Sequence, residues 1–416
     1  MNERLLQFIW QHQYFSKEQL STTTGQLIHI LSPGVLNTNQ GPDFSAARIL
    51  VDGIQLAGSV ELHVRTSQWE AHGHTGDVHY SNVILHVVWE NDVKDAAVLE
   101  LKGRIAASLL HKYALLMKQQ EQIPCASLIP SVPDLVWSGW KERLIAERIN
   151  EKSTHIQKLL QRTNHHWEEV FWQLIARNFG LPHNSSAFEA VAQSLSVILL
   201  AKHKNQIHQI EALLLGQAGL LEQEVHDSYA IMLQKEYRYL KKKHGLSIIH
   251  HPLKFLRMRP SNFPTVRLAQ LAMLVHQSSH LFSKVLEAGS MAQIKKMLNV
   301  TANDFWHTHY TLTEAAPYRI KKLGDVMVNN LLINTIVPLL FEYAAVHREP
   351  EVQQKAIEWL RQLPKENNSI TRLWEEAHTV HSNALDSQAL LHLKKQYCDA
   401  KRCLECAAGN AILKRN

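Results

Sequence analysis

Cysteines and long apolar runs are scarce in this sequence of 416 residues. Four cysteines cannot form a disulfide framework in a chain of this length, which excludes the class of small disulfide-stapled secreted proteins. No run approaches the roughly 18 apolar residues of a membrane-spanning helix, and the N-terminal segment carries Glu3 and lacks the apolar core of a signal peptide. We therefore expect a cytoplasmic protein that does not contact a membrane.

The rest of the composition is that of a folded protein with an excess of histidine. Hydrophobic residues make up 45% of the chain and charged residues 20%, values that argue against wholesale disorder. The length suffices for about two or three domains. Histidine occurs 26 times. Imidazole ligates metals and exchanges protons near neutral pH, so the excess favours metal or acid–base chemistry.

Charge and hydrophobic period divide the chain in two. Residues 1–126 hold 9 Lys/Arg and 12 Asp/Glu, a net charge of −3, whereas the remaining residues hold 35 and 26, a net charge of +9. The first part has short alternating runs separated by turn signals, and the second is almost wholly of helical period. Three prolines over residues 122–136 mark the boundary. We predict an α+β domain over residues 1–126 and an all-α domain over residues 127–416.

The first part has the pattern of a mixed sheet with flanking helices. The Asp52-Gly53 pair predicts a two-residue hairpin turn, which makes residues 45–51 and 54–65 antiparallel neighbours. Residues 82–91 are apolar on both faces, as expected of a central parallel strand. The predicted elements are a helix over residues 2–14, a short helix from Ser16, and strands over residues 25–32, 45–51, 54–65, 82–91 and 97–103.

The second part has the pattern of an irregular helical domain. No fixed repeat period relates its helices, so a solenoid is not expected. Proline and glycine fall between the helices, where they end helical segments. The predicted helices cover residues 137–162, 165–179, 186–203, 206–215, 222–240, 265–287, 291–298, 324–345, 350–362, 370–377 and 384–396.

The first candidate site combines Asp43 with polar residues of the strand over 54–65. Glu61, His63 and Arg65 share one face of that strand because side chains alternate with period 2. Asp43 lies at the mouth of the neighbouring strand, so two carboxylates can hold one Mg²⁺ or Mn²⁺ that activates a water. We predict Asp43 and Glu61 as metal ligands, with His63 and Arg65 stabilising charge.

This arrangement resembles the PD-(D/E)xK nuclease superfamily. Pro42-Asp43 matches its Pro-Asp, Glu61 matches its acidic residue, and His63 stands where the superfamily has lysine. The resemblance implies a restriction-endonuclease-like core that hydrolyses phosphodiesters of DNA with a metal-activated water. At the lysine position the charge-stabilising role would pass to His63, Arg65 or both. The same departure leaves open a catalytically inactive protein that binds nucleic acid.

The second candidate site lies between the hairpin and the central strand, at His72, His74 and Asp77. An H-x-H pair with a nearby aspartate can ligate Zn²⁺ or Mn²⁺. It resembles the H-x-H-x-D-H run of metallo-β-lactamase-like hydrolases, although the spacing differs by one residue on each side of the aspartate. These side chains could line the same cleft as Glu61, or they could be the metal ligands of a zinc-dependent hydrolase of a small substrate. The alternative is a polar loop with surface histidines.

The third candidate site is Cys398-x4-Cys403-x2-Cys406, with Cys125 as the fourth member. Four thiolates can hold one Zn²⁺ or an iron–sulfur cluster, and this would join the C-terminal segment to the domain junction. The arrangement resembles the iron–sulfur staple of some recombination nucleases of the PD-(D/E)xK group, except that Cys125 follows the nuclease-like core. The alternative is a set of buried reduced cysteines.

Basic segments of the second part are candidates for nucleic-acid binding. Lys241 and Lys242 lie among aromatic residues, and Arg257, Arg259 and Arg267 surround a proline-bounded turn that opens a helix. Such groups bind phosphates. We expect DNA as the partner and a basic surface that faces the Asp43 cleft, because an acidic metal site repels a polyanion until cations compensate. The alternative is a solvated helix face.

Several stretches resemble the uncharacterised bacterial domain-of-unknown-function family 2851. They span both parts of the chain, so the resemblance implies that the two parts belong together as one unit, and it implies no activity. The stretches are NQGPDFSAARI, GSVELHVRTSQWEAHGHTGDVHYSNVILHVVW, FLRMRPSNFPTVRLAQLA, INTIVPLLFEYA and YCDAKRCLECAAGNAILK.

Overall fold

The computed structural model describes residues 1–247, 249, 251–278 and 280–414. Packing divides the chain into two units, each with its own hydrophobic core. Unit 1 comprises Met1–Leu144, Asn367–Val380 and Leu390–Asn416, and unit 2 comprises Ile145–Glu366 and His381–Ala389. This division differs from the boundary expected at residues 126/127. The C-terminal segment belongs to unit 1 because Cys403 and Leu413 lie in the same buried core as the sheet.

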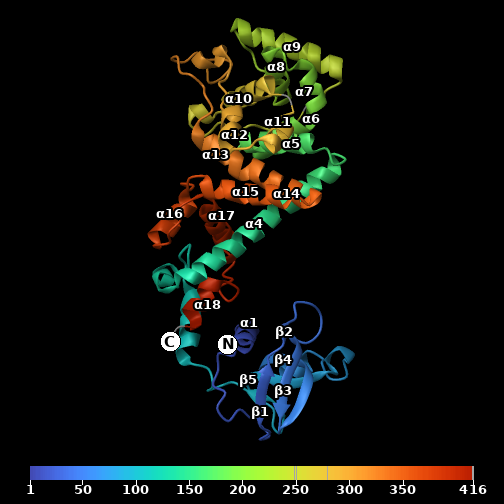
Figure 1. Ribbon diagram of the computed structural model, residues 1–416, viewed down its shortest axis with the longest axis vertical. Helices are drawn as coiled ribbons and strands as arrows, with labels where there is room; N and C mark the ends of the chain where they lie inside the picture. The colour runs from blue at the N-terminus through green and yellow to red at the C-terminus, as the bar shows by residue number, and fades with distance from the viewer. Residues whose placement is uncertain (248, 250, 279, 415–416) are drawn as a thin grey trace. The chain divides into compact units, whose positions relative to one another are not determined.

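Unit 1 is built on a six-stranded mixed sheet in the order β1-β3-β4-β5-β6, with β2 paired to β3 (Figure 1). β1, β3 and β4 are antiparallel neighbours, whereas β5 lies parallel to β4 and β6 parallel to β5. The predicted hairpin turn is confirmed, since Asp52 and Gly53 both have the positive φ that it requires. The strands are β1 (Ile28–Ser32), β2 (Val35–Leu36), β3 (Phe44–Val51), β4 (Ile54–Arg65), β5 (Val83–Glu90) and β6 (Leu99–Glu100).

Helix α1 begins where the sequence predicts, because the Asn2 side chain accepts the Leu5 amide at 2.9 Å. The short helix expected from Ser16 is wrong. This segment forms a turn instead, and the Ser16 hydroxyl accepts the Glu18 amide. The helices of unit 1 are α1 (Glu3–His12), α2 (Gln68–Ala71), η1 (Val78–Tyr80), α3 (Ala107–Lys118), η2 (Ala126–Ser131), α16 (Ser369–Glu376), η6 (Lys394–Cys398) and α18 (Ala407–Lys414).

The segment after α1 forms turns because Gln19 has a left-handed φ of 47°, which a right-handed helix does not accommodate. The amide of Ser16 donates to the carbonyl of Arg104 at 2.8 Å, so this segment is fixed by contacts with a distant part of unit 1. Helix α3 was not among the predicted elements. Its N-cap position is Ala106, which provides no side-chain acceptor and therefore no start signal in the sequence.

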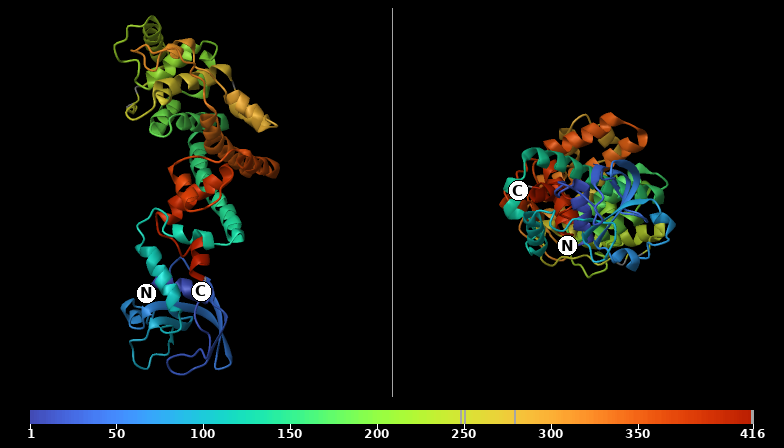
Figure 2. Two further views of the ribbon diagram at one scale, coloured as in Figure 1. Left: turned by 90° about the vertical axis from the view of Figure 1, so that its left-hand side faces the viewer. Right: turned by 90° about the horizontal axis from the view of Figure 1, so that it is seen from below.

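Unit 2 is a group of helices, as predicted (Figures 1 and 2). The helix expected over residues 186–203 is divided, because the Ser196 hydroxyl accepts the Leu199 amide and starts a new helix. The helix expected over residues 265–287 is also divided, and His280, with a φ of 53°, lies between the two pieces. The longer helices are α4 (Asp134–Arg162), which begins in unit 1, α5 (Trp167–Phe179), α6 (Ser185–Ser194), α7 (Val197–His203), α8 (Ile207–Gln217), α9 (Ser228–His244), α10 (Pro264–Gln277), α11 (Leu281–Glu287), α12 (Met291–Leu298), α15 (Pro350–Gln362) and α17 (Ala384–Leu393).

One apolar helix passes through the core of unit 2. It consists of α13 (Asp325–Leu331), a π-helical segment (Leu332–Ile336) and α14 (Val337–His347). The π-helical segment ends two residues before Pro338, a residue that lacks an amide hydrogen to donate. By length and composition the whole helix could cross a membrane, but 67% of its most apolar window is buried inside the protein, as in a core helix.

Candidate metal centre

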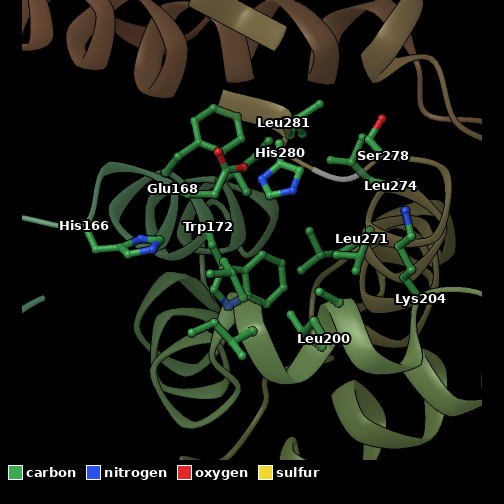
Figure 3. A pocket seen from close by; sticks show the side chains of 16 residues that line it. His166, Glu168, Trp172, Leu200, Lys204, Leu271, Leu274, Ser278, His280 and Leu281 are labelled. Atoms are coloured by element: carbon green, nitrogen blue, oxygen red, sulfur yellow. The ribbon is translucent and has the colours of Figure 1, made fainter. Parts of the chain in front are cut away.

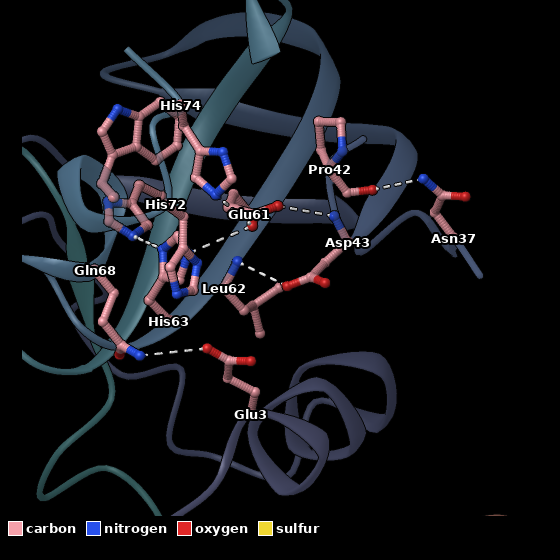
Figure 4. Close-up of polar contacts among 12 residues, drawn as sticks. Glu3, Asn37, Pro42, Asp43, Glu61, Leu62, His63, Gln68, His72 and His74 are labelled. Atoms are coloured by element: carbon pink, nitrogen blue, oxygen red, sulfur yellow. Dashed lines mark hydrogen bonds and ion pairs between the residues drawn. The ribbon is translucent and has the colours of Figure 1, made fainter. Parts of the chain in front are cut away.

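Strand β4 carries the two polar residues on which the site is built. Val60 and Leu62 face the apolar core of unit 1, and the alternation of the strand places Glu61 and His63 on the opposite face. That face is covered too, since Glu61 is 6% exposed and His63 1%. The cover is the segment between β4 and β5, from which Trp69, His72 and His74 contact the His63 ring (Figure 4).

Asp43 and Glu61 are held side by side by hydrogen bonds to the backbone. Glu61 Oε2 accepts the Asp43 amide at 2.9 Å, and Asp43 Oδ2 accepts the Leu62 amide at 3.1 Å (Figure 4). The remaining oxygen of Asp43 accepts the side-chain amide of Gln7, from α1, at 2.8 Å. Glu61 Oε1 is then directed at two imidazoles, 3.6 Å from His63 Nε2 and 3.6 Å from His74 Nε2.

Three imidazoles lie close together here, and two of them face this oxygen. The ligand atoms of His63, His72 and His74 all lie within 4.8 Å of one another, which is close enough for one ion. His74 is buried, yet neither of its ring nitrogens has a hydrogen-bond partner among the described residues. A buried polar atom without a partner costs about 1–3 kcal/mol, so this imidazole points to a ligand that satisfies it.

A fourth histidine, His86, contacts His63 and orients its ring. His63 Nδ1 lies 2.9 Å from His86 Nε2, on the parallel strand β5, where His86 is the register partner of Glu61. This contact fixes the ring orientation of His63 and leaves its Nε2 facing Glu61 and His72. His86 therefore has the position of an outer residue that orients a metal ligand.

Burial sets the protonation of the site. It raises the pKa of Glu61 to about 8, with the Asp43 carboxylate adding to the effect, and it raises the pKa of Asp43 to about 6. Burial and the neighbouring imidazoles lower the pKa of His63 to about 3. His63 is thus neutral at pH 7, the form that ligates metals, and it cannot supply the positive charge expected of it in the role of the superfamily lysine.

The structure does not bring two other predicted residues into the site. Arg65 is exposed at the end of β4, where its charge acts on Glu90 and Asp92, so a charge-stabilising role beside Glu61 is not supported. Asp77 caps the short helix η1 by accepting the His79 amide at 2.9 Å. A ligand set of His72, His74 and Asp77 is therefore not formed, whereas His72 and His74 do line the same site as Glu61.

The sequence interpretation missed His86 and Gln7. His86 lies in a run taken as apolar on both faces, and only the parallel register of β5 on β4 reveals that it is beside Glu61. Gln7 gave no signal, because its partner Asp43 is distant in sequence. The Tyr80 ring stacks on His74 with ring centroids 3.8 Å apart, which holds that imidazole in place.

A known protein family matches most of the chain. Residues 3–369 match the family described as Protein of unknown function (DUF2851). The chain belongs to the DUF2851 family. No curated protein and no solved structure matches it. The cysteines at 398–406 lie beyond the residues that match the family.

The basic residues predicted to bind nucleic acid all lie in unit 2 of the DUF2851 chain. Arg267 donates to Gln270 Oε1 at 3.0 Å and to Asn262 Oδ1 at 2.6 Å, and burial lowers its pKa to about 10. It anchors the start of α10 and is poorly placed to contact phosphate. Arg257 and Arg259 are exposed.

Lys241 and Lys242 lie in the last turn of α9, where positive charge is favourable at the negative end of the helix dipole. Lys242 is exposed, and Lys241 lies over the Tyr237 ring, 5.9 Å from its centroid. This local role does not need a nucleic acid. Phosphate binding by these lysines stays a prediction, as does a basic surface that faces the Asp43 cleft.

Unit 2 of the DUF2851 chain also contains an apolar cavity of ≈ 210 Å³ (Figure 3). Its walls include Phe171, Trp172 and Leu271. The carboxylate of Glu168, at its rim, accepts the Phe282 amide at 3.1 Å and so serves the start of α11. His166, Glu168, Lys204 and His280 also line it, but among the described residues they form no group close enough to hold one ion. The unit 1 site, where three imidazoles lie together, is therefore the better candidate for chemistry.

Proposed function

We propose that the DUF2851 chain is a metal-dependent hydrolase of phosphodiesters in nucleic acid, with DNA as the expected substrate. The observation that supports this proposal best is the position of Glu61 Oε1, 3.6 Å from the Nε2 atoms of both His63 and His74 in a buried site. The ligand atom of His72 lies within 4.8 Å of those of His63 and His74, so this side chain is the fourth ligand that we propose.

The donor set favours Mn²⁺ or Zn²⁺ over Mg²⁺. Imidazole nitrogen suits the first two ions, whereas Mg²⁺ prefers carboxylate, phosphate and water oxygens in an octahedral shell. A bound ion of this kind supplies a Lewis acid and an activated water. Glu61, His63, His72 and His74 would hold it.

Asp43 has the position of a group that handles a proton beside the metal ligands. Its carboxylate is fixed by the Leu62 amide and by the Gln7 side chain, so it keeps a single orientation next to Glu61. With a pKa raised to about 6 by burial, the carboxyl exchanges a proton near neutral pH, as a general base must. His86 holds His63 by its Nδ1 atom and orients the ligand without touching the ion.

A zinc-dependent hydrolase of a small substrate is the second candidate. A cavity of ≈ 490 Å³ is lined in part by Trp69, Thr66 and His86, and its size would suit a compact ligand. The absence of Asp77 from the imidazole set argues against the ligand pattern first expected for such an enzyme, but the same centre of Glu61 and three imidazoles would serve it.

The test is cleavage by purified full-length protein that has been stripped with a chelator and reloaded with one metal at a time. We expect Mn²⁺ or Zn²⁺ to restore cleavage of single- or double-stranded DNA. Glu61→Gln and His74→Ala should each lower the rate by at least about 100-fold, because each removes a ligand. His79→Ala, an exposed histidine of the same segment, is the matched control and should leave the rate unchanged.

Three results would separate the proposals. Metal-dependent DNA cleavage that survives Glu61→Gln would come from a contaminant and refute the site. DNA binding without cleavage under every metal would support an inactive nucleic-acid-binding protein. Hydrolysis of small phosphodiester or ester substrates, with no effect on DNA, would favour the second candidate.

A further inference from the structure

The four cysteines come from three places in the chain and meet in unit 1. Cys125 directly precedes η2, Cys398 is the last residue of η6, and Cys406 directly precedes α18. Helix α18 packs against η2, which brings its start towards Cys125. The Cys398 thiol interacts electrostatically with each of the other three, and the Cys125 thiol does so with Cys403 and Cys406. We refer to these four residues as the cysteine cluster.

Hydrogen-bond donors surround one of the sulfurs. The backbone amides of Ala408 and Gly409, in the first turn of α18, donate to the Cys406 sulfur, as does the indole N–H of Trp140. That indole is buried and has no oxygen or nitrogen acceptor among the described residues. Donors of this kind stabilise a thiolate, and in metal–thiolate centres they tune the metal.

Gly409 permits this approach. A Cβ atom at this position would lie 2.2 Å from the carbonyl oxygen of Cys403, so any other residue would force α18 away from the loop that carries Cys403. Two lysines add positive charge, Lys394 towards Cys398 and Lys401 towards Cys403. Burial nevertheless dominates and raises the pKa of all four thiols. A bound metal would supply the positive charge that thiolates need in such buried surroundings.

The spacing of the sulfurs distinguishes two kinds of centre. Around a single Zn²⁺, four sulfurs at about 2.3 Å from the metal lie about 3.8 Å from one another. Among the described residues, His63, His72 and His74 have ligand atoms that all lie within 4.8 Å of one another. No three of the cysteine sulfurs lie as close together as that. Sulfurs that are grouped but more widely spaced fit a cluster of several irons better than a single ion.

We propose that Cys125, Cys398, Cys403 and Cys406 hold an iron–sulfur cluster that fastens the C-terminal segment to the rest of unit 1. The cluster is distinct from the imidazole centre, and neither proposal depends on the other. Its function is structural, because it links the segment after residue 390 to the segment around residue 125 within one unit.

The test is the iron and sulfide content of full-length protein purified without oxygen. We expect about four irons and four acid-labile sulfides per chain, with the visible absorption of a cluster and an electron paramagnetic resonance signal after reduction. Zinc without sulfide would overturn the iron–sulfur assignment, and the lack of any stoichiometric metal would overturn the site. These measurements use the unaltered protein and do not depend on the folding of a variant.

Substitutions test which residues hold the iron–sulfur cluster. Cys125→Ser and Cys406→Ser should each lose iron, whereas His74→Ala, which affects the imidazole centre, should keep it. Trp140→Phe retains all four sulfurs and removes one donor, so we expect the iron content to stay and the reduction potential to fall. Iron that survives Cys125→Ser, or a reduction potential unchanged by Trp140→Phe, would contradict the proposed surroundings.

Discussion

The Asp43 amide donates to the Glu61 carboxylate at 2.9 Å, and through this bond two acidic residues of adjacent strands share one buried site. Such a pair is unfavourable without a cation, because both carboxylates are shielded from water and repel each other. The imidazoles of His63, His72 and His74 lie close together beside this pair. A divalent ion, as proposed above, would relieve this repulsion.

The stability of the metal-free protein should depend on the protonation of Glu61. Its pKa is raised to about 8, so the stability due to this group is fully present below pH 4.5 and is lost as the pH rises through 8. Glu61→Gln has no such loss. We expect the melting temperature of Glu61→Gln, relative to that of the metal-free wild type, to increase between pH 5 and pH 8.

Mn²⁺ should reverse that difference, since it binds the ionised carboxylate of the wild type and not the amide of the variant. Differential scanning calorimetry with and without metal measures both effects. A melting-temperature difference that stays constant across the pH range would show that Glu61 is not protonated in the folded protein.

Gln7 should act through Asp43. Gln7→Ala removes the hydrogen bond to Asp43 Oδ1, and the loss of a bond to a charged group corresponds to about 1.5–3 kcal/mol, or roughly 10–100-fold in rate. We expect kcat to fall by this amount while KM changes little, and the pH profile of kcat to move. Gln11→Ala, an exposed residue of the same helix, is the control. Equal rates for the two variants would remove Asp43 from the reaction.

His86 should affect metal affinity without being a ligand. His86→Phe removes the contact that orients His63, and outer residues of this kind typically contribute 10–100-fold to affinity, as an order of magnitude. Isothermal titration with Mn²⁺ should show weaker binding at unchanged stoichiometry. Complete loss of binding would instead make His86 a ligand.

The arginines of unit 2 should separate into two kinds. Arg257→Ala with Arg259→Ala should weaken DNA binding and reduce its salt dependence by roughly one unit of log–log slope for each lost phosphate contact. Arg267→Ala should lower the melting temperature, because its guanidinium bonds Asn262 and Gln270. Binding by fluorescence anisotropy over a salt series would test this, and an unchanged slope in the double variant would rule out these arginines as phosphate contacts.

The sequence was sufficient for the sheet and for half of the site. Alternation along β4 and the Asp52-Gly53 turn are local signals, and they placed Glu61 and His63 on one face. His86 depends on the parallel register between β4 and β5, which no local pattern encodes. Arg65 lies outside the site because the strand ends there and its side chain is exposed to solvent near Glu90.

The helical part shows the same limit. Hydrophobic period predicted where helices lie, but the division at Ser196 depends on a side-chain cap that competes with helix continuation. The four cysteines were recognised from their number and spacing, whereas the donors around Cys406 come from a tryptophan distant in sequence and from the start of α18. Contacts of this kind follow from packing alone.

The most direct test of the imidazole centre is anomalous X-ray diffraction from crystals of the full-length protein soaked with Mn²⁺. We expect one strong peak in unit 1, about 2.0–2.4 Å from Glu61 Oε1 and from ligating nitrogens of His63, His72 and His74. The peak should be absent in His74→Ala. A saturating soak that leaves this position empty, or a peak on Asp77 and His79 instead, would contradict the account.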